Sequence, residues 1–455
     1  MQLIDLFEDV PADRLLWAIS PDEEYTASQL RAWCIHSRQT LLDLRGKKVA
    51  VLATGDFDLA LMLLCLDGWA ESLTLLTAGS DQISDAICAS GCEVLLVRQQ
   101  MEFAPPIPVR VAPPFSLNVP NASNEALLDQ HCRTRWVLSS SGTTGQPKLI
   151  SHSLSSLVRT VSRDLDRGSN FVWGSLYHVS SFAGIQVLLQ SWFAGSKLVF
   201  SVAGVPLSKR IASFAACGCN ALSATPTLWR VLMMSDHGGL RLRQVTLGGE
   251  IADQAILDAL RARFRDANLV HIFASTEAGV GFSVRDGREG FPARLLIEPP
   301  NGVRLRVDAQ GHLWLKPLNS DQRLAHGKQE LRDEDGFIDT GDVVELVGDR
   351  YQFRGRSTGA INVGGRKVHP QEVESWLLRY PGVRLARVSA KKNPIMGSIV
   401  QATVVLSEGC DGASPDFKSG LTRFCREHLE PYKIPAILRV AESIPVSDTG
   451  KIART

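Results

Sequence analysis

Short apolar runs alternate with amphipathic segments over residues 1 to about 130. Lys48–Ala53, Ser72–Leu76 and Glu93–Val97 have the length and composition of buried strands, and Gly46 and Gly55 bound the first of them. Segments with apolar residues at helical spacing come before or between these runs, at Leu30–Leu44, Phe57–Trp69 and Ile83–Ser90. Strands that alternate with helices in this way predict a parallel, doubly wound α/β sheet.

The same rhythm resumes after a segment without a clear period. Met101–Asn124 is rich in proline and polar residues, which predicts a loop or a linker between subdomains. A strand at Trp136–Ser139 follows, and a helix is predicted at Asp253–Phe264. The other predicted strands of this second α/β unit are Lys197–Val202, Ala221–Ala224, Gln244–Leu247 and Leu269–Phe273.

The pattern changes again towards the C-terminus. Residues 294–355 read as short strands with frequent Gly and Asp turns, which indicates a smaller β unit. Residues 357–455 then predict a compact α+β unit, with a helix at Pro370–Arg379 and a strand at Ile399–Leu406. We therefore predict an α/β protein. Its N-terminal domain, residues 1–355, would contain doubly wound α/β subdomains and the small β unit, and residues 356–455 would form a small C-terminal α+β domain.

Length and composition narrow the class of protein. A chain of 455 residues is long enough for two or three core-forming units. The formal net charge of +1 and the 7% aromatic content argue against a nucleic-acid partner. The N-terminus lacks an apolar signal core, and the longest apolar stretch, Leu59–Leu66, is too short to span a membrane. The nine cysteines are scattered, without zinc-site spacing, so we expect a cytoplasmic protein with reduced thiols.

A segment rich in hydroxyl groups and glycine follows the strand at Trp136–Ser139. Residues 139–148 read SSSGTTGQPK, so side-chain hydroxyls and backbone N–H groups are concentrated just before Lys148. Such groups bind phosphate oxygens, and glycine allows the backbone to approach them closely. The segment is not a Walker A loop, because Gly142 and Gly145 are three residues apart and Lys148 follows a proline. It predicts a phosphate site of another kind.

This segment resembles the phosphate-binding signature of the acyl-adenylate-forming superfamily, which includes acyl- and aryl-CoA ligases. The resemblance extends from about residue 136 to the end of the chain, and more loosely over the first 130 residues. It implies an ATP site in which this loop cradles phosphate. The loop residues implied are Ser140, Ser141, Gly142, Thr143, Thr144, Gly145 and Lys148.

Tyr177-His178 resembles the aromatic-histidine segment that borders the carboxylate pocket in acyl and aryl members. By that resemblance His178, Phe182 and Gly184 would line the acid site, with His178 in a catalytic role. Members that activate amino acids carry an Asp after the aromatic pair, where this chain has Val179. An α-amino acid is therefore disfavoured, because its buried ammonium would have no partner.

Two turns resemble the family's adenine and metal motifs. Gly248-Gly249-Glu250 resembles the turn in which Gly248 floors the acyl pocket while the next two residues touch adenine. Residues 273–277, FASTE, resemble the aromatic-Gly-x-Thr-Glu segment, with Phe where Tyr is usual and Ala where Gly is usual. The implied roles are adenine stacking by Phe273, nucleotide contacts by Ala274 and Ser275, an α-phosphate contact by Thr276, and Mg²⁺ binding by the catalytic Glu277.

The last motifs would connect the two domains. The resemblance implies that Asp342 binds the ribose hydroxyls and that Arg356 meets ribose or phosphate, at a hinge near residues 356–359. Gly364 and Gly365 match the glycines beside the pantetheine tunnel. Lys451 matches the catalytic lysine that bridges the acid and the α-phosphate. The small C-terminal domain would be mobile and would rotate between two half-reactions.

We therefore expect an ATP- and Mg²⁺-dependent ligase that forms an acyl-adenylate, releases pyrophosphate and transfers the acyl group to CoA. An aryl or a short- to medium-chain acyl acid is the expected substrate, and the protein is expected to be a monomer or homodimer. The phosphopantetheine of an acyl carrier protein is an alternative acceptor. A luciferase-like oxidation is a further alternative. A non-catalytic, nucleotide-binding regulatory protein would lack catalytic positions, yet Lys148, Glu277, Asp342, Arg356 and Lys451 are all present.

Overall fold

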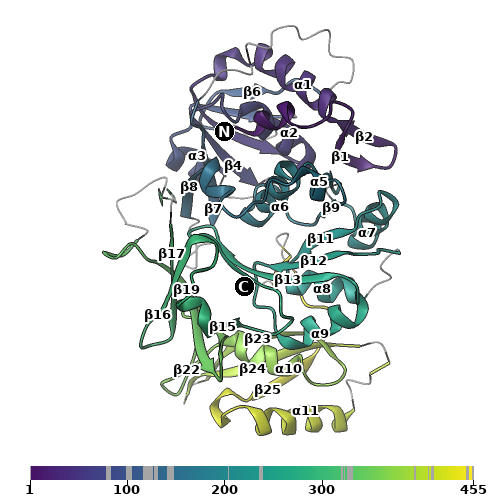
Figure 1. Ribbon diagram of the computed structural model, residues 1–455. Coiled ribbons are helices and arrows are strands. Elements are labelled where there is room, and N and C mark those ends of the chain that lie inside the picture. Colours follow the sequence, from purple (N-terminus) through teal and green to yellow (C-terminus); the bar gives the residue numbers. More distant parts are fainter. Residues whose placement is uncertain are drawn as a thin grey trace.

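The computed structural model divides into a large upper part and a smaller lower part that contains α10 and α11 (Figure 1). The last described residues, 450–452, return from the C-terminal unit to the turn after β12 and the start of α8. The described residues are 2–77, 83–98, 105–115, 127, 132–140, 148–202, 204–234, 239–318, 321, 323–324, 332–393, 396–407, 409–410, 414–446 and 450–452.

The first sheet has the strand order β18-β8-β7-β4-β3-β5-β6. Its parallel strands include β3 (Lys48–Ala53), β4 (Ser72–Thr77) and β5 (Val94–Val97), which confirms the predicted α/β unit. Its helices are α1 (Ala27–Thr40), α2 (Asp56–Leu66) and α3 (Ile83–Ser90). The remaining strands are β6 (Val109–Val111), β7 (Arg135–Ser140), β8 (Lys148–Ser153) and β18 (Arg323–Leu324). The predicted loop at Met101–Asn124 was thus wrong at β6, a short edge strand whose residues are exposed.

The second sheet has the order β14-β13-β12-β11-β9-β10-β1-β2. Its parallel strands are β9 (Val172–Ser175), β10 (Lys197–Val199), β11 (Ala221–Ala224), β12 (Gln244–Gly248) and β13 (Asn268–Ser275), with β14 (Gly279–Val284) antiparallel at one edge. The other edge is unexpected, because β1 (Leu15–Ser20) and β2 (Glu23–Thr26) come from the start of the chain. The helices of this unit are α4 (Leu154–Leu157), α5 (Leu165–Gly168), α6 (Phe182–Phe193), α7 (Leu207–Ala216), α8 (Pro226–Met233) and α9 (Gln254–Arg263).

Two smaller sheets complete the fold, as the sequence pattern predicts. The β unit has the order β15-β20-β19-β17-β16, formed by Phe291–Pro292, Arg350–Arg356, Ile338–Val347, His312–Pro317 and Val303–Val307. The C-terminal unit has the order β22-β21-β24-β23, with β25 beside β24. Its elements are β21 (Ile361–Val363), β22 (Arg366–Val368), α10 (Pro370–Leu377), β23 (Val383–Asn393), β24 (Gly397–Leu406), α11 (Pro415–His428) and β25 (Ile437–Val440). Short 3₁₀ helices lie at Leu3–Glu8, Leu42–Leu44, Ala293–Leu296, Pro300–Gly302 and Pro431–Lys433.

A single apolar cluster joins the two α/β units. It contains residues of α1, α2 and β3 from the first unit and of α6 and β10 from the second. The residues of α2 from Leu59 to Leu66 are all buried, so this helix is covered on every side. Because α2 is fixed in this way, the position of its first residue, Asp56, is fixed too. Asp56 contacts the second unit at Val179.

Each of the nine cysteines falls within the described ranges, and none forms a disulfide. No helix in the described part of the chain has both the length and the apolar character needed to cross a bilayer.

A buried carboxylate, Asp67, ties three distant segments together. Its two oxygens accept hydrogen bonds from the Trp136 indole at 2.9 Å and from the backbone N–H of Leu3 at 2.8 Å. Burial raises the pKa of Asp67 to about 6, although both hydrogen bonds act in the opposite direction. The folded state therefore holds a proton on this group more tightly than the unfolded chain, where an Asp has a pKa of about 3.9.

We expect this group to make stability depend on pH. Its contribution is complete below about pH 4 and is lost as the pH rises through about 6, so between about pH 5 and pH 7.5 it should fall by roughly 1–1.5 kcal/mol. Asp67→Asn has no titrating group at this position, so its stability should lack this loss. The free energy of unfolding of the wild type minus that of Asp67→Asn should therefore be lower at pH 7.5 than at pH 5, by roughly 1–1.5 kcal/mol. Urea unfolding at the two pH values measures it, with Asp43→Asn at an exposed site as the control. An unchanged difference would contradict the assignment.

Candidate active site

The chain end brings Lys451 against a turn of the second sheet. A Cβ atom placed on Gly249 would lie 3.5 Å from Lys451 Cε and 3.9 Å from its Nζ, so the lysine packs on the turn that follows β12. The hydroxyl of Thr225, at the start of α8, donates a hydrogen bond to the Gly450 carbonyl. Gly450 has a φ of +74°, and a Cβ there would lie 2.2 Å from Leu228 Cδ1. Only a glycine fits this position without strain.

Several predicted site residues surround the Lys451 ammonium. Burial lowers the pKa of Lys451, and Arg356 lowers it further, while the carboxylates of Glu250, Asp342 and Glu277 raise it. These charges come from the turn after β12, the turn after β13 and strands β19 and β20. The charge of Lys451 thus interacts electrostatically with side chains of both the second α/β unit and the small β unit.

Asp342 and Arg356 lie directly opposite each other on β19 and β20. Arg356 Nε is 3.4 Å from Asp342 Oδ1, and the carboxyl is buried while the guanidinium is partly exposed. Burial raises the pKa of Asp342 to about 6, and Arg356 opposes that shift. A buried carboxylate beside one partly exposed cation retains acceptor capacity for hydroxyl donors.

Phe273 and the residues after it lie where β13 ends. The Phe273 ring is nearly parallel to two other rings, with centroids 5.1 Å from Phe282 and 5.2 Å from Phe353. These contacts orient the ring in the structure, and the predicted adenine stacking by Phe273 stays a prediction. Ser275 stabilises the turn, because its hydroxyl accepts the backbone N–H of Ala278 at 3.0 Å.

Tyr177 and His178 follow β9, and Tyr177 contacts the same turn as Lys451. Tyr177 donates its hydroxyl to the Gly248 carbonyl at 3.1 Å, and burial raises the pKa of this phenol. His178 Nδ1 lies 3.1 Å from Asp56 Oδ1. A Cβ on Gly184 would lie 1.9 Å from the His178 carbonyl oxygen, so glycine is required where α6 packs behind this segment. Phe182, in the first turn of α6, is buried.

The predicted phosphate loop connects β7 to β8. Ser140, at the end of β7, pairs with Lys148, at the start of β8, in an antiparallel ladder. Lys148 is exposed. The rest of the predicted loop, Ser141, Gly142, Thr143, Thr144 and Gly145, lies outside the described residues.

The predicted thiol-binding glycines lie elsewhere. Gly364 and Gly365 form the turn between β21 and β22, with φ values of +56° and +85°. Their backbone N–H groups donate to Met396 O and to Asn362 Oδ1, both within the C-terminal unit. The structure therefore brings Lys451 to the Gly249 turn, and it leaves the Gly364–Gly365 turn exposed.

Two kinds of contact hold the C-terminal unit in this position. An apolar cluster joins Val231 and Met234, at the end of α8, to Leu385, Val405 and Ile444 of the C-terminal unit. An ion pair joins Arg379, just after α10, to Glu289, with Arg379 Nη2 2.7 Å from Glu289 Oε1. Ile452, next to Lys451, packs against the same apolar cluster, so this cluster helps to set the position of Lys451.

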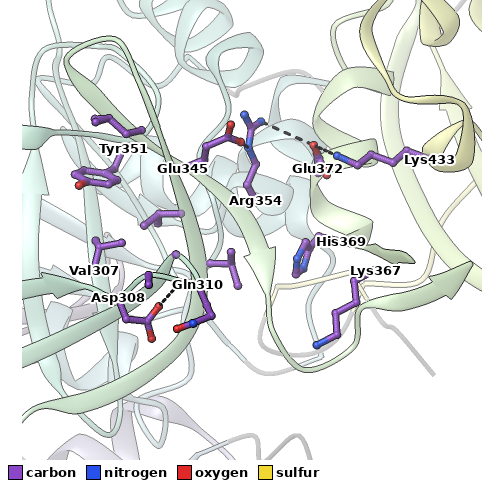
Figure 2. Close-up of a pocket in the computed structure, with 15 residues that line it drawn as sticks. Val307, Asp308, Gln310, Glu345, Tyr351, Arg354, Lys367, His369, Glu372 and Lys433 are labelled. Carbon is purple, nitrogen blue, oxygen red and sulfur yellow. Dashed lines mark hydrogen bonds and ion pairs between the residues drawn. The ribbon is translucent and has the colours of Figure 1, made fainter. Parts of the chain in front are cut away.

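A cleft of about 500 Å³ separates the small β unit from the C-terminal unit. Figure 2 shows Arg354 reaching from β20 towards Glu372 of α10, which also contacts Lys433. The distances are 4.0 Å from Arg354 Nη1 and 2.9 Å from Lys433 Nζ to the same Glu372 oxygen. The cleft is not lined by the groups around Lys451, so we do not assign it to the active site.

The backbone between the two units leaves room for motion. Ser357 is still held, because its N–H donates to the Gly341 carbonyl at 2.8 Å. Gly359 has a φ of +92°, and a Cβ there would meet no described atom within 4 Å. The predicted hinge at residues 356–359 thus begins at a strand end that is hydrogen-bonded through Ser357. It ends at Gly359, which has no close neighbours among the described residues.

Sequence reasoning missed two polar residues of the site, His152 and Asp56. His152 on β8 is fully buried, and its pKa is lowered to about 4 mainly by burial, with the Thr276 backbone acting in the opposite direction. Asp56 holds His178. A histidine inside an apolar strand and an aspartate after a glycine at a helix start were visible signals for these two residues.

Comparison with protein families places these residues in a known context. The family described as "AMP-binding enzyme" matches residues 120–316, and the family described as "AMP-binding enzyme C-terminal domain" matches residues 372–451. Among curated relatives, the human mitochondrial acyl-coenzyme A synthetase ACSM2B is 24% identical in an alignment of 395 residues. The alignment covers 74% of this chain and 64% of that protein. The 2-succinylbenzoate–CoA ligase of Listeria monocytogenes is 26% identical over 346 residues, covering 71% of this chain and 69% of the ligase.

Solved structures support the same fold. The anthranilate CoA ligase AuaEII in complex with anthranoyl-AMP superposes with a TM-score of 0.81 at 20% identity, covering 99% of this chain and 95% of that one. The o-succinylbenzoate CoA synthetase of Bacillus subtilis superposes with a TM-score of 0.71 at 18% identity, covering 99% and 96%. The predicted arrangement of a large N-terminal and a small C-terminal domain is confirmed, and the chain belongs to the AMP-binding enzyme family.

Proposed function

We propose that this protein is an AMP-forming acid–thiol ligase. It activates a carboxylic acid as its acyl-adenylate, releases pyrophosphate, and transfers the acyl group to CoA. The observation that supports this best is the desolvated ammonium of Lys451 among the charges of Glu250, Glu277, Asp342 and Arg356. The curated relatives named as acyl-CoA synthetases and CoA ligases support the same chemistry.

The first half-reaction joins two anions, so its main requirement is neutralisation and alignment of charge. The acid carboxylate attacks the α-phosphorus of ATP, and pyrophosphate leaves. In this proposal Lys451 bridges the two anions, and Asp342 accepts hydrogen bonds from the ribose hydroxyls. Among the described residues no cluster of three His, Cys, Asp or Glu side chains could hold a resident metal. The single carboxylate of Glu277 fits Mg²⁺ that arrives bound to phosphates and would neutralise their charge.

The second half-reaction requires a different arrangement of the C-terminal unit. A thiol attacks the acyl carbon of the mixed anhydride, and AMP leaves. We propose that the unit rotates about residues 356–359, which withdraws Lys451 and brings the Gly364–Gly365 turn to the acyl group. The open position of Gly359 supports this motion. CoA is the proposed acceptor, and carrier-protein phosphopantetheine is the alternative.

The acid pocket supports an aryl or a short- to medium-chain acyl substrate. Phe182 is buried beside the His178 segment, and Val179 stands where a carboxylate would be needed to bind an amino group. The related structures include enzymes named for anthranilate and o-succinylbenzoate. We place the enzyme in the cytoplasm, consistent with its reduced cysteines.

The proposed function predicts acid-dependent release of pyrophosphate from MgATP. A panel of benzoate, anthranilate, 2-succinylbenzoate, hexanoate and leucine should give turnover with an aryl or acyl member and none with leucine. Adding CoA or a phosphopantetheinylated carrier protein, and detecting the thioester by mass spectrometry, identifies the acceptor. The absence of pyrophosphate release with every acid would contradict the proposal.

Lys451→Ala should separate the two half-reactions. Loss of the ammonium should abolish acid-dependent ATP–pyrophosphate exchange, because the repulsion between the carboxylate and the α-phosphate is then no longer neutralised by Lys451. Thioester formation from a supplied acyl-adenylate should be retained, since Lys451 has left the site by then. The control is Lys433→Ala, which removes a lysine of the same unit from the Figure 2 cleft. Loss of both half-reactions in a folded Lys451→Ala protein would refute this role.

Arg379→Gln should shift the position of the C-terminal unit. It removes an ion pair to Glu289 that we expect to be worth about 0.5–1 kcal/mol, so pyrophosphate exchange should slow by about two- to fivefold. The thioester step from a supplied adenylate should not slow. Arg384→Gln is the matched control, because Arg384 bonds Ser407 within its own unit. Equal slowing of both half-reactions would show that the ion pair does not act on domain position.

A further inference from the structure

Asp56 connects the first α/β unit to the predicted acid pocket. It is the first residue of α2, and its side chain is only 8% exposed. Its Oδ1 atom accepts the backbone N–H of Val179 at 2.8 Å and lies 3.1 Å from His178 Nδ1. One oxygen therefore fixes both the backbone and the ring of neighbouring residues in the second unit.

The contact determines which ring nitrogen carries hydrogen. An ionised carboxylate is an acceptor without a donor, so the short Nδ1–Oδ1 distance requires that Nδ1 of His178 is protonated. Any second proton on this ring must then be on Nε2. The Nδ1 edge faces the buried carboxylate, so the Nε2 edge points away from Asp56, and the His178 side chain is 37% exposed.

A second cation lies near Asp56. Arg210, on α7, donates from Nη2 to the Leu176 carbonyl at 3.3 Å. Burial lowers the pKa of Arg210, and the charge of Asp56 acts in the opposite direction. Asp56 could therefore matter as the counter-charge of Arg210 or as the support of His178. The hydrogen-bonding geometry favours the second role, because no described hydrogen bond joins Asp56 to Arg210.

We propose that Asp56 is a positioning residue that holds His178 in the Nδ1–H tautomer, with its Nε2 edge towards the carboxylic acid substrate. The proposal rests on the proposed function, since it names the residue that orients the wall of that acid pocket. Tyr177 supports the location, because its hydroxyl contacts Gly248 on the turn against which Lys451 packs. Positioning groups of this kind affect the binding and alignment of the acid more than those of ATP.

The tautomer can be measured without any substrate. In protein labelled with ¹⁵N-histidine at about pH 8.5, where most histidines are neutral, two-bond ¹H–¹⁵N spectra distinguish the two tautomers. The His178 signals are identified by their absence in His178→Gln. We expect the Nδ1–H form in the wild type and in Asp56→Asn, whose amide oxygen can still accept both hydrogen bonds. We expect the Nε2–H form to gain population in Asp56→Ala. An Nε2–H tautomer in the wild type would overturn the proposal.

Kinetics test the consequence for the acid. With the most active acid of the panel above, Asp56→Ala should raise the KM for the acid or lower its kcat/KM by about tenfold or more, with the KM for ATP within about twofold. Asp56→Asn should retain most of the activity. Asp58→Ala is the matched control, since Asp58 lies in the same helical turn but pairs with Arg98.

Three results would overturn the positioning role. Equal losses in Asp56→Asn and Asp56→Ala would assign the effect to the charge beside Arg210. Equal losses in Asp56→Ala and Asp58→Ala would assign it to the packing of α2, as would a parallel rise in the KM for ATP. If the wild type releases no pyrophosphate with any acid, the proposed function fails, while the tautomer experiment still decides whether Asp56 orients His178.

Discussion

The desolvation of one ammonium group is the constraint on which the rest of the structure depends. Lys451 is partly buried, which lowers its pKa, and neighbouring carboxylates stabilise such a charge. Those carboxylates come from segments that are far apart in the sequence, so both the second sheet and the small β unit must be folded before the site exists. The chain end must also return to them, and the glycine at position 450 allows this because its neighbour Leu228 leaves no room for a Cβ.

The sequence predicted elements well where a strand is buried on both faces. Lys48–Ala53 and Ala221–Ala224 were predicted to the residue, because parallel strands covered on both faces are continuous apolar runs with sharp polar or glycine boundaries. The β1–β2 hairpin was missed. Its second strand is only four residues long and begins with the exposed Glu23. Its place in the second sheet, beside β10, depends on a contact across about 180 residues that no local pattern records.

The site shows the same division between local and distant information. Motif order placed Glu277, Asp342, Arg356 and Lys451, because each belongs to a short segment with a recognisable composition. Asp56 and His152 belong to no such predicted site motif, and Asp56, like Thr225, acts by holding another group. Their roles depend on contacts between residues that are far apart in the sequence. One example is the hydrogen bond from the Thr225 hydroxyl to the carbonyl of Gly450, 225 positions away. Supporting residues of this kind are therefore found only when the chain is seen folded.

The contacts of the C-terminal unit fit the proposed withdrawal of Lys451, which is partly buried. Its apolar contact with α8 is small, involving Val231, Met234 and a few partners, and it is accompanied by the ion pairs of Arg379 with Glu289 and of Arg354 with Glu372. An interface of this composition resembles a transient association more than a continuous core. The α/β units, in contrast, share one large apolar cluster and should move as one body. The carboxylates and His178 would then stay fixed, while Lys451 alone among the central charges would be delivered and withdrawn by the proposed rotation.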